Sequence, residues 1–115
     1  MTTLYGIKNC DKIKAARRWL DQHAIEYRFH DYRDDGLDTR QVERWLGALG
    51  AEALVNRRST TWRSLSAADQ ARLTGGSAAK LLCQHPTLVK RPLLEHGKHL
   101  VVGFSATDYA SLLGT

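Results

Sequence analysis

The sequence predicts an α/β fold in which a βαβ unit is followed by a ββα unit, with a helical insertion between them and one mixed four-stranded sheet. Three observations predict this fold. A β-favouring run at residues 3–7 leads directly into apolar residues at helical spacing. An alternating strand pattern follows after a short connection. Near the end of the chain, two strand patterns flank a glycine turn and precede a last helix.

The first strand pattern, residues 3–7, ends at a turn signal formed by Lys8 and Asn9. A helix is expected after Cys10, because apolar residues recur there at offsets near three and four. These residues are Ile13, Ala16, Leu20 and Ala24. Residues 25–31 alternate between apolar and polar side chains and predict a second strand. A strand, helix and strand joined this closely predict two parallel strands with a right-handed crossover.

The insertion begins with a capping-box pattern at residues 38–41, Asp-Thr-Arg-Gln. The helix that follows should end at Gly50 and should place four apolar residues on one face. These residues are Val42, Trp45, Leu46 and Leu49. Residues 54–62 have no clear period and predict a loop or a short helix. Two more short helices are expected, one from Ser66 to the glycine pair at 75–76 and one over residues 77–83.

The last part of the chain predicts a β-hairpin and a helix. Strand character is found at residues 88–89, 93–94 and 99–102, and Gly97 supplies the hairpin turn. Ser105 should cap a final helix that carries Tyr109 and two leucines. The resulting element order is that of a thioredoxin-like domain. Because 115 residues suffice for one hydrophobic core, we expect a single domain over residues 1–115.

The overall charge is basic, with a net charge of +5 and a pI near 9.5. The basic residues are spread through the chain and mixed with acidic ones, so a small anionic substrate is a better-supported partner than a nucleic acid. No apolar run reaches the length of a membrane span, and the first residues lack the hydrophobic segment of a signal peptide. We therefore expect a cytoplasmic protein that does not enter the membrane.

Cys10 is the residue whose position points most clearly to chemistry. A thiol in the first turn of a helix faces unpaired N–H groups and the positive end of the helix dipole, and both favour the thiolate. Lys8, Lys12 and Lys14 act in the same direction, and Asp11 opposes them. The alternative is that Cys10 is an inert, half-buried cysteine.

Cys83 is the second cysteine, and its distance from Cys10 in the sequence does not suggest a disulfide framework or a metal site. Its neighbours Leu81 and Leu82 indicate a buried helix face, where a cysteine behaves as a small hydrophobic residue. The alternative is a resolving thiol that forms a disulfide with Cys10. The sequence has no Gly-rich phosphate loop and no cluster of His and Cys, so we expect no bound metal, flavin or nucleotide.

Three separated blocks carry a resemblance to a known family: Tyr-Gly-Ile-Lys-Asn-Cys at residues 5–10, Asn-Arg-Arg-Ser-Thr-Thr-Trp at 56–62, and Gln-His-Pro-Thr-Leu-Val-Lys-Arg-Pro at 84–92. In this order, and along nearly the whole chain, they resemble the ArsC-like proteins. This family contains the glutathione- and glutaredoxin-type arsenate reductases. Within it, the sequence is most similar to the YffB branch and more distantly similar to the Spx transcription regulators.

The resemblance implies a role for several residues. Cys10 would be the nucleophile, and Arg58 and Arg91 would bind an anion and lower the pKa of the thiol. A guanidinium suits this role because its planar fork pairs with oxyanions and never loses its charge. Arg57 is an alternative to its neighbour Arg58. Pro92 would be the proline that thioredoxin-like folds hold in the cis form beside the cysteine.

The anion-binding candidates also include Lys8, Asn9 and Lys12, which surround the cysteine in the sequence. Two departures from the family limit what can be carried over. A third arginine of the arsenate reductases falls on Val102 or Gly103, so arsenate is doubtful as the natural substrate. The Cys-x-x-Cys motif of Spx is absent, because its second cysteine falls on Ile13.

These observations predict a glutathione-dependent thiol reductase that uses Cys10 as its single nucleophile. It would hold no bound cofactor and would use glutathione as co-substrate to reduce an oxidised thiol substrate. Two alternatives stay open. One is a protein-binding regulator without enzymatic activity, as in the Spx branch, which would have a protein partner. The other is a true arsenate reductase.

Overall fold

The structure is a computed structural model that describes residues 2–8 and 10–114. Its contacts divide the chain into two compact units. The sheet unit combines residues 1–35 with residues 91–115, and the helical unit contains residues 36–90. Among the described residues, no helix is both long and apolar enough to cross a membrane.

The sheet unit is built on four strands in the order β2-β1-β3-β4. They are β1 (Thr2–Gly6), β2 (Arg28–Asp31), β3 (Leu93–His96) and β4 (His99–Val102). The pair β1–β2 is parallel, and β1–β3 and β3–β4 are antiparallel. The mixed four-stranded sheet of the predicted thioredoxin-like fold is therefore confirmed.

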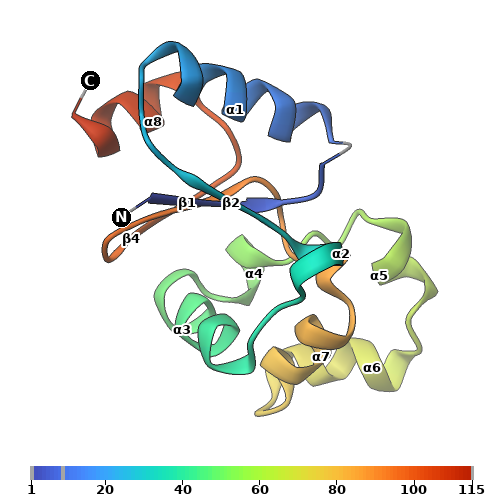
Figure 1. Ribbon diagram of the computed structural model, residues 1–115. Coiled ribbons are helices and arrows are strands. Elements are labelled where there is room, and N and C mark those ends of the chain that lie inside the picture. The colour runs from blue at the N-terminus through green and yellow to red at the C-terminus, as the bar shows by residue number, and fades with distance from the viewer. Residues whose placement is uncertain (1, 9, 115) are drawn as a thin grey trace. The chain divides into compact units, whose positions relative to one another are not determined.

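Two helices cover one face of this sheet, α1 (Asp11–Gln22) and α8 (Ala106–Leu113) (Figure 1). Side chains from the helices and the sheet form a common buried core, and Tyr109 of α8 meets Trp19 of α1 edge to face with 5.7 Å between ring centroids. The core residues are Leu4, Ala16, Trp19, Leu20, Leu94 and Tyr109. This packing fixes α1, and therefore the residue at its beginning, against the central strand β1.

The helical unit is the predicted insertion. It contains α3 (Thr39–Leu49), α4 (Ala51–Leu54), α5 (Thr60–Ser64), α6 (Ala67–Ala71), α7 (Ala78–Gln84) and two 3₁₀ turns, η1 (Arg72–Thr74) and η2 (Pro86–Leu88). An isolated bridge pairs Val55, which follows α4, with Val89, which follows η2. Gly50 ends α3 with a positive φ of 81°, as predicted.

Three expectations from the sequence are wrong in detail. The strand expected from residue 25 begins only at Arg28, where the pairing with β1 begins. Ile25 and Tyr27 pack against the core of the sheet unit, as Phe29 of β2 also does, so their alternation reflects burial and does not mark the start of pairing. Residues 88–89 do not belong to the hairpin. Leu88 ends the turn η2, and Val89 pairs with Val55 in an isolated bridge instead of with a strand of the hairpin.

The third error concerns helix starts. Asp38 occupies the N-cap position of α3, but its side chain makes no capping hydrogen bond. Ser105 does cap α8, because its Oγ accepts a hydrogen bond from the N–H of Asp108 at 3.3 Å.

The sequence pattern also missed α2 (Tyr32–Asp35), a single helical turn that directly follows β2.

Candidate active site

Cys10 lies between β1 and α1, at the N-cap position of the helix. Its backbone is extended, with φ −106° and ψ 129°, and its carbonyl accepts the first hydrogen bond of α1 from the N–H of Lys14 at 3.0 Å. The residue is half-buried. The strand and the helix therefore deliver a partly accessible thiol to the end of the helix where N–H groups lack partners.

The surroundings of the Cys10 thiol lower its pKa below the ordinary value. Partial burial is the largest single influence and acts in the opposite direction, because it disfavours the charged thiolate. The backbone N–H groups of Ile13 and Lys12, together with the Arg91 guanidinium, outweigh it. These N–H groups belong to the first turn of α1, where the helix dipole also favours a negative charge.

Arg91 reaches the thiol from the other end of the chain. It precedes β3, which pairs with β1, and the Arg91–Pro92 peptide bond is cis, the form that the resemblance implies. Its side chain lies within hydrogen-bonding reach of the Cys10 sulfur, and its Nε atom is fully buried. The pairing of β1 with β3 is thus what brings a guanidinium and a thiol together.

A close approach between β1 and α1 fixes the first helical turn beside Cys10. Gly6 ends β1, and the fully buried Ile13 side chain packs directly on its Cα. A Cβ at Gly6 would lie 2.7 Å from Ile13 Cγ1 and closer still to Cδ1. Only glycine leaves room for this contact, which holds the N–H of Ile13 near the thiol.

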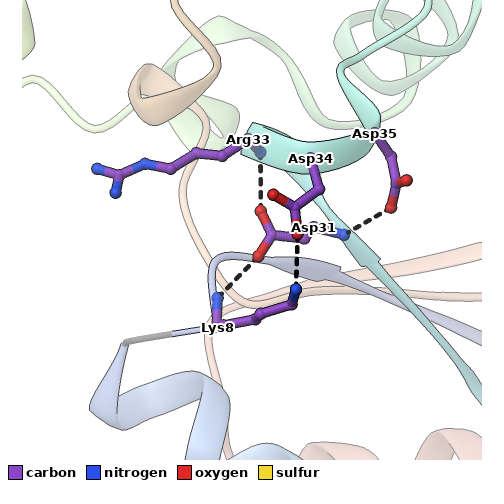
Figure 2. A network of polar contacts seen from close by, with 5 residues as sticks. All are labelled: Lys8, Asp31, Arg33, Asp34 and Asp35. Carbon is purple, nitrogen blue, oxygen red and sulfur yellow. Dashed lines mark hydrogen bonds and ion pairs between the residues drawn. The ribbon is translucent and has the colours of Figure 1, made fainter.

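A network of acidic and basic residues surrounds the segment that leads to Cys10 (Figure 2). The Asp31 carboxylate accepts hydrogen bonds from the backbone N–H groups of Lys8 at 3.1 Å and Arg33 at 2.8 Å. The N–H of Asp31 donates to Asp35 Oδ2 at 3.3 Å. Lys8 Nζ pairs with Asp34 Oδ2 at 2.6 Å. The predicted anion-binding ammonium of Lys8 is therefore already paired with a carboxylate.

The other predicted site residues lie in different places. Lys12 is exposed on α1 and contributes its backbone N–H to the thiol. Arg58 is exposed in the helical unit, where its N–H donates to Asn56 Oδ1 at 3.0 Å. The Arg57 guanidinium lies 5.7 Å from the ring centroid of Trp62. Asn9 lies outside the described residues. The roles of Arg58, its alternative Arg57 and Asn9 in anion binding stay predictions.

Two residues next to the site were not found by sequence reasoning, Asp31 and Tyr32. Tyr32 is buried, and its hydroxyl has no hydrogen-bond partner in the described part of the chain. Burial raises the pKa of this hydroxyl, although the nearby Arg91 guanidinium lowers it, so the tyrosine stays neutral. The available signal was their position in the sequence. Asp31 is the last residue of β2 and Tyr32 follows it, and the carboxyl ends of parallel strands meet at one edge of a sheet.

Cys83 lies in the last turn of α7, in the helical unit. It is half-buried, and its sulfur lies 3.8 Å from the hydroxyl oxygen of Thr39. Across residues 2–8 and 10–114, no group of three or more His, Cys, Asp or Glu side chains is arranged to hold a metal ion.

Known proteins resemble this chain along almost its whole length. The model of the ArsC family matches residues 5–112. An uncharacterized protein of Haemophilus influenzae is 43% identical over 109 residues, which cover 95% of this chain and 96% of that protein. A solved structure of the YffB protein has a TM-score of 0.90 and 42% identity, and the match covers 96% of this chain and 97% of that one. The global transcriptional regulator Spx 1 of Lactococcus lactis is less similar, at 28% identity over 115 residues, 98% of this chain and 89% of the regulator.

Proposed function

The chain belongs to the ArsC family, and from this premise we propose that it is a thiol-dependent reductase with Cys10 as nucleophile and glutathione as reducing co-substrate. One observation carries the proposal: the half-buried thiol at the beginning of α1 lies within reach of the Arg91 guanidinium. Thiol–disulfide exchange requires an accessible thiol that is ionised near neutral pH.

The reaction would proceed in two exchanges on a mixed disulfide between glutathione and a substrate thiol. The Cys10 thiolate attacks the glutathione sulfur, so that a Cys10–glutathione disulfide forms and the substrate leaves as a thiolate, which takes up a proton. A second glutathione thiolate then attacks the bound glutathione sulfur. Glutathione disulfide is released, and the Cys10 thiolate is regenerated. In sum, one glutathione thiol is oxidised and one substrate thiol is set free, while the glutathione sulfur of the mixed disulfide stays at the disulfide level and leaves in glutathione disulfide.

Arg91 supports both exchanges, because a cation beside the sulfur stabilises the thiolate as it attacks and as it leaves. Glutathione also carries two carboxylates that guanidinium groups can pair with, and Arg58 is the second candidate from the family resemblance. Glutathione is kept reduced in the cytoplasm, and we place the enzyme there.

The residues at the place of the third arginine, Val102 and Gly103, favour glutathione, a large anion, over arsenate. Val102 pairs with Leu93, and the N–H of Gly103 donates to the Pro92 carbonyl at 2.8 Å, so the place of the third arginine lies beside the segment that carries Arg91. An apolar side chain and a glycine add no positive charge there. A compact oxyanion needs several charged donors in one small volume.

A protein-binding role of the Spx type is the second candidate, since the similarity to Spx 1 covers 98% of this chain. Its redox switch cannot operate between Cys10 and the fourth position of the motif, which is Ile13, a buried apolar residue. A partner protein that binds without any need for the thiol would support this second candidate.

Mass spectrometry after incubation with glutathione disulfide tests the proposal. We expect one glutathionyl group on Cys10 in the wild type and in Cys83→Ala, and none in Cys10→Ser. Added glutathione should then release the group and restore the free thiol. Steady-state assays should give weak or no arsenate reduction, and Val102→Arg should increase it. Efficient arsenate turnover by the wild type without formation of the glutathione adduct would contradict the proposal.

A further inference from the structure

We propose that the buried carboxylate of Asp31 is a positioning residue for Cys10, which it orients by fixing the backbone of Lys8. This inference rests on the proposed use of Cys10 as nucleophile. Asp31 does not contact the thiol in any interaction that the structure records among its described residues. It acts on the segment that leaves β1 and carries the cysteine two residues later.

The sheet register places Asp31 where it can hold that segment. Strand β2 runs parallel to β1, and Asp31 is aligned with Gly6, the last residue of β1. The carboxylate extends from the end of β2 toward Lys8, in the segment that follows β1. Its two oxygens face two backbone N–H groups (Figure 2). Oδ2 accepts from Lys8 and Oδ1 accepts from Arg33.

These two bonds need a carboxylate rather than another small polar group. Asp31 is 5% exposed, and an ionised carboxyl in such a place is stable only where it accepts hydrogen bonds. Burial raises its pKa, but the N–H groups of Arg33, Lys8 and Asp34 lower the pKa more, so the group is ionised near neutral pH. An asparagine would offer one accepting oxygen and would turn an N–H group toward the other donor.

Cys10 is therefore held from both sides. On the helix side, its carbonyl starts α1 and Ile13 is seated on Gly6. On the strand side, Lys8 is tied to Asp31. The thiolate is stabilised only while the sulfur stays close to the N–H groups of α1 and to Arg91, and such contacts weaken steeply with distance and angle. Release of Lys8 should let the thiol move away from them.

The exposed ion pair of the same network provides a matched control. Lys8 Nζ and Asp34 Oδ2 belong to side chains that are 62% and 57% exposed, and pairs of this kind contribute little to stability. Asp34→Asn removes one negative charge near the segment, as Asp31→Asn does, but leaves the bond from Lys8 N–H to Asp31 in place.

The sign of the effect separates positioning from simple electrostatics. Removal of a negative charge near a thiolate stabilises the thiolate, so charge alone predicts that Asp31→Asn makes Cys10 ionise at lower pH. Loss of positioning predicts the opposite, ionisation at higher pH. The two explanations therefore cannot be confused in a titration.

The experiment measures the pH dependence of Cys10 alkylation by iodoacetamide in the full chain with Cys83→Ala as background. Asp31→Asn should move the profile to higher pH and slow alkylation about fivefold at a pH below the midpoint of the parent protein, the order of effect of one hydrogen bond. Asp34→Asn should give the profile of the parent protein or a small shift to lower pH. Thermal unfolding of each variant checks that it is folded.

Asp31→Glu is the second variant if Asp31→Asn does not fold, because it keeps the charge but, with one more methylene, changes the position of the carboxylate relative to the N–H groups of Lys8 and Arg33. It should shift the profile in the same direction. A folded Asp31 variant that melts at lower temperature but keeps the profile of the parent would overturn the inference and make Asp31 merely structural. A parent protein whose Cys10 reacts no faster than an ordinary cysteine would overturn the proposed function instead, and the inference with it.

Discussion

Arg91 acts together with the backbone N–H groups of Ile13 and Lys12 to lower the pKa of the Cys10 thiol. The guanidinium lies within hydrogen-bonding reach of the sulfur, and its Nε atom is shielded from water. A hydrogen bond to a charged group contributes about 1.5–3 kcal/mol, more than a neutral one. Part of the thiolate stabilisation should therefore depend on this one side chain, beside the N–H groups of Ile13 and Lys12.

Arg91→Gln should raise the pKa of Cys10, because it removes the cation and leaves the N–H groups of α1 to act alone against burial. We expect the alkylation rate below the wild-type midpoint to fall about tenfold. Arg18→Gln, an exposed position on α1, is the matched control and should leave the rate unchanged. Equal rates in the two variants would show that Arg91 does not act on the thiol.

Asp31 should also contribute to stability in a pH-dependent way. Its pKa is lowered in the folded chain, so its contribution is fully present above the unfolded pKa of about 3.9 and is lost as the pH falls through the folded pKa. Near neutral pH, Asp31→Asn should lower the free energy of unfolding by about 1–3 kcal/mol. In urea titrations at several pH values, this difference should shrink below about pH 3.9. A difference that does not change with pH would mean that the carboxylate is not ionised in its hydrogen bonds.

Among the elements, the junction of β1 and α1 depends on one glycine. Gly6→Ala would push a methyl group into the buried Ile13 side chain, and overpacking of this kind costs about 1–3 kcal/mol. Because the N–H of Ile13 faces the thiol, the variant should also react more slowly at Cys10. Gly47→Ala is the control, since no atom lies within 4 Å of its added Cβ and alanine favours the helix α3 by about 1 kcal/mol. Urea unfolding should show opposite signs for the two variants.

The helix caps give a second comparison between elements. Ser105→Ala should lower the free energy of unfolding by about 1 kcal/mol, because it removes the bond to the N–H of Asp108 at the beginning of α8. Asp38→Ala should cost less, because Asp38 makes no capping bond at α3 despite its favourable residue type. A larger loss for Asp38→Ala would mean that its side chain caps α3 in solution.

In the whole molecule, the features that sequence reasoning predicted correctly are those with a local signal. Helical spacing after Cys10 predicted α1, the turn at Gly97 predicted the hairpin, and Ser105 marked the start of α8. The predicted start of β2 was wrong, since Ile25 and Tyr27 are packed against the core just as Phe29 is, but pairing with β1 begins only at Arg28. A pattern of burial cannot by itself show where pairing begins.

The contacts that build the candidate site are not local, and so the sequence could predict only part of them. Arg91 entered through the family resemblance, and its contact with Cys10 depends on the pairing of β1 with β3. Asp31 was assigned only as the last residue of a strand. Its bond to Lys8 follows from the parallel register of β1 and β2, which no property of Asp31 itself reveals.

The measurement that tests the account most directly is the titration of thiolate absorbance in Cys83→Ala, with the Cys83→Ala, Cys10→Ser double variant as the blank. We predict a single transition with a pKa clearly below the ordinary cysteine value of about 8.5, because the N–H groups of α1 and the Arg91 guanidinium outweigh burial. The same titration with Arg91→Gln added should move the transition upward. A pKa at or above about 8.5 in the Cys83→Ala protein would contradict the central claim that Cys10 is an activated nucleophile.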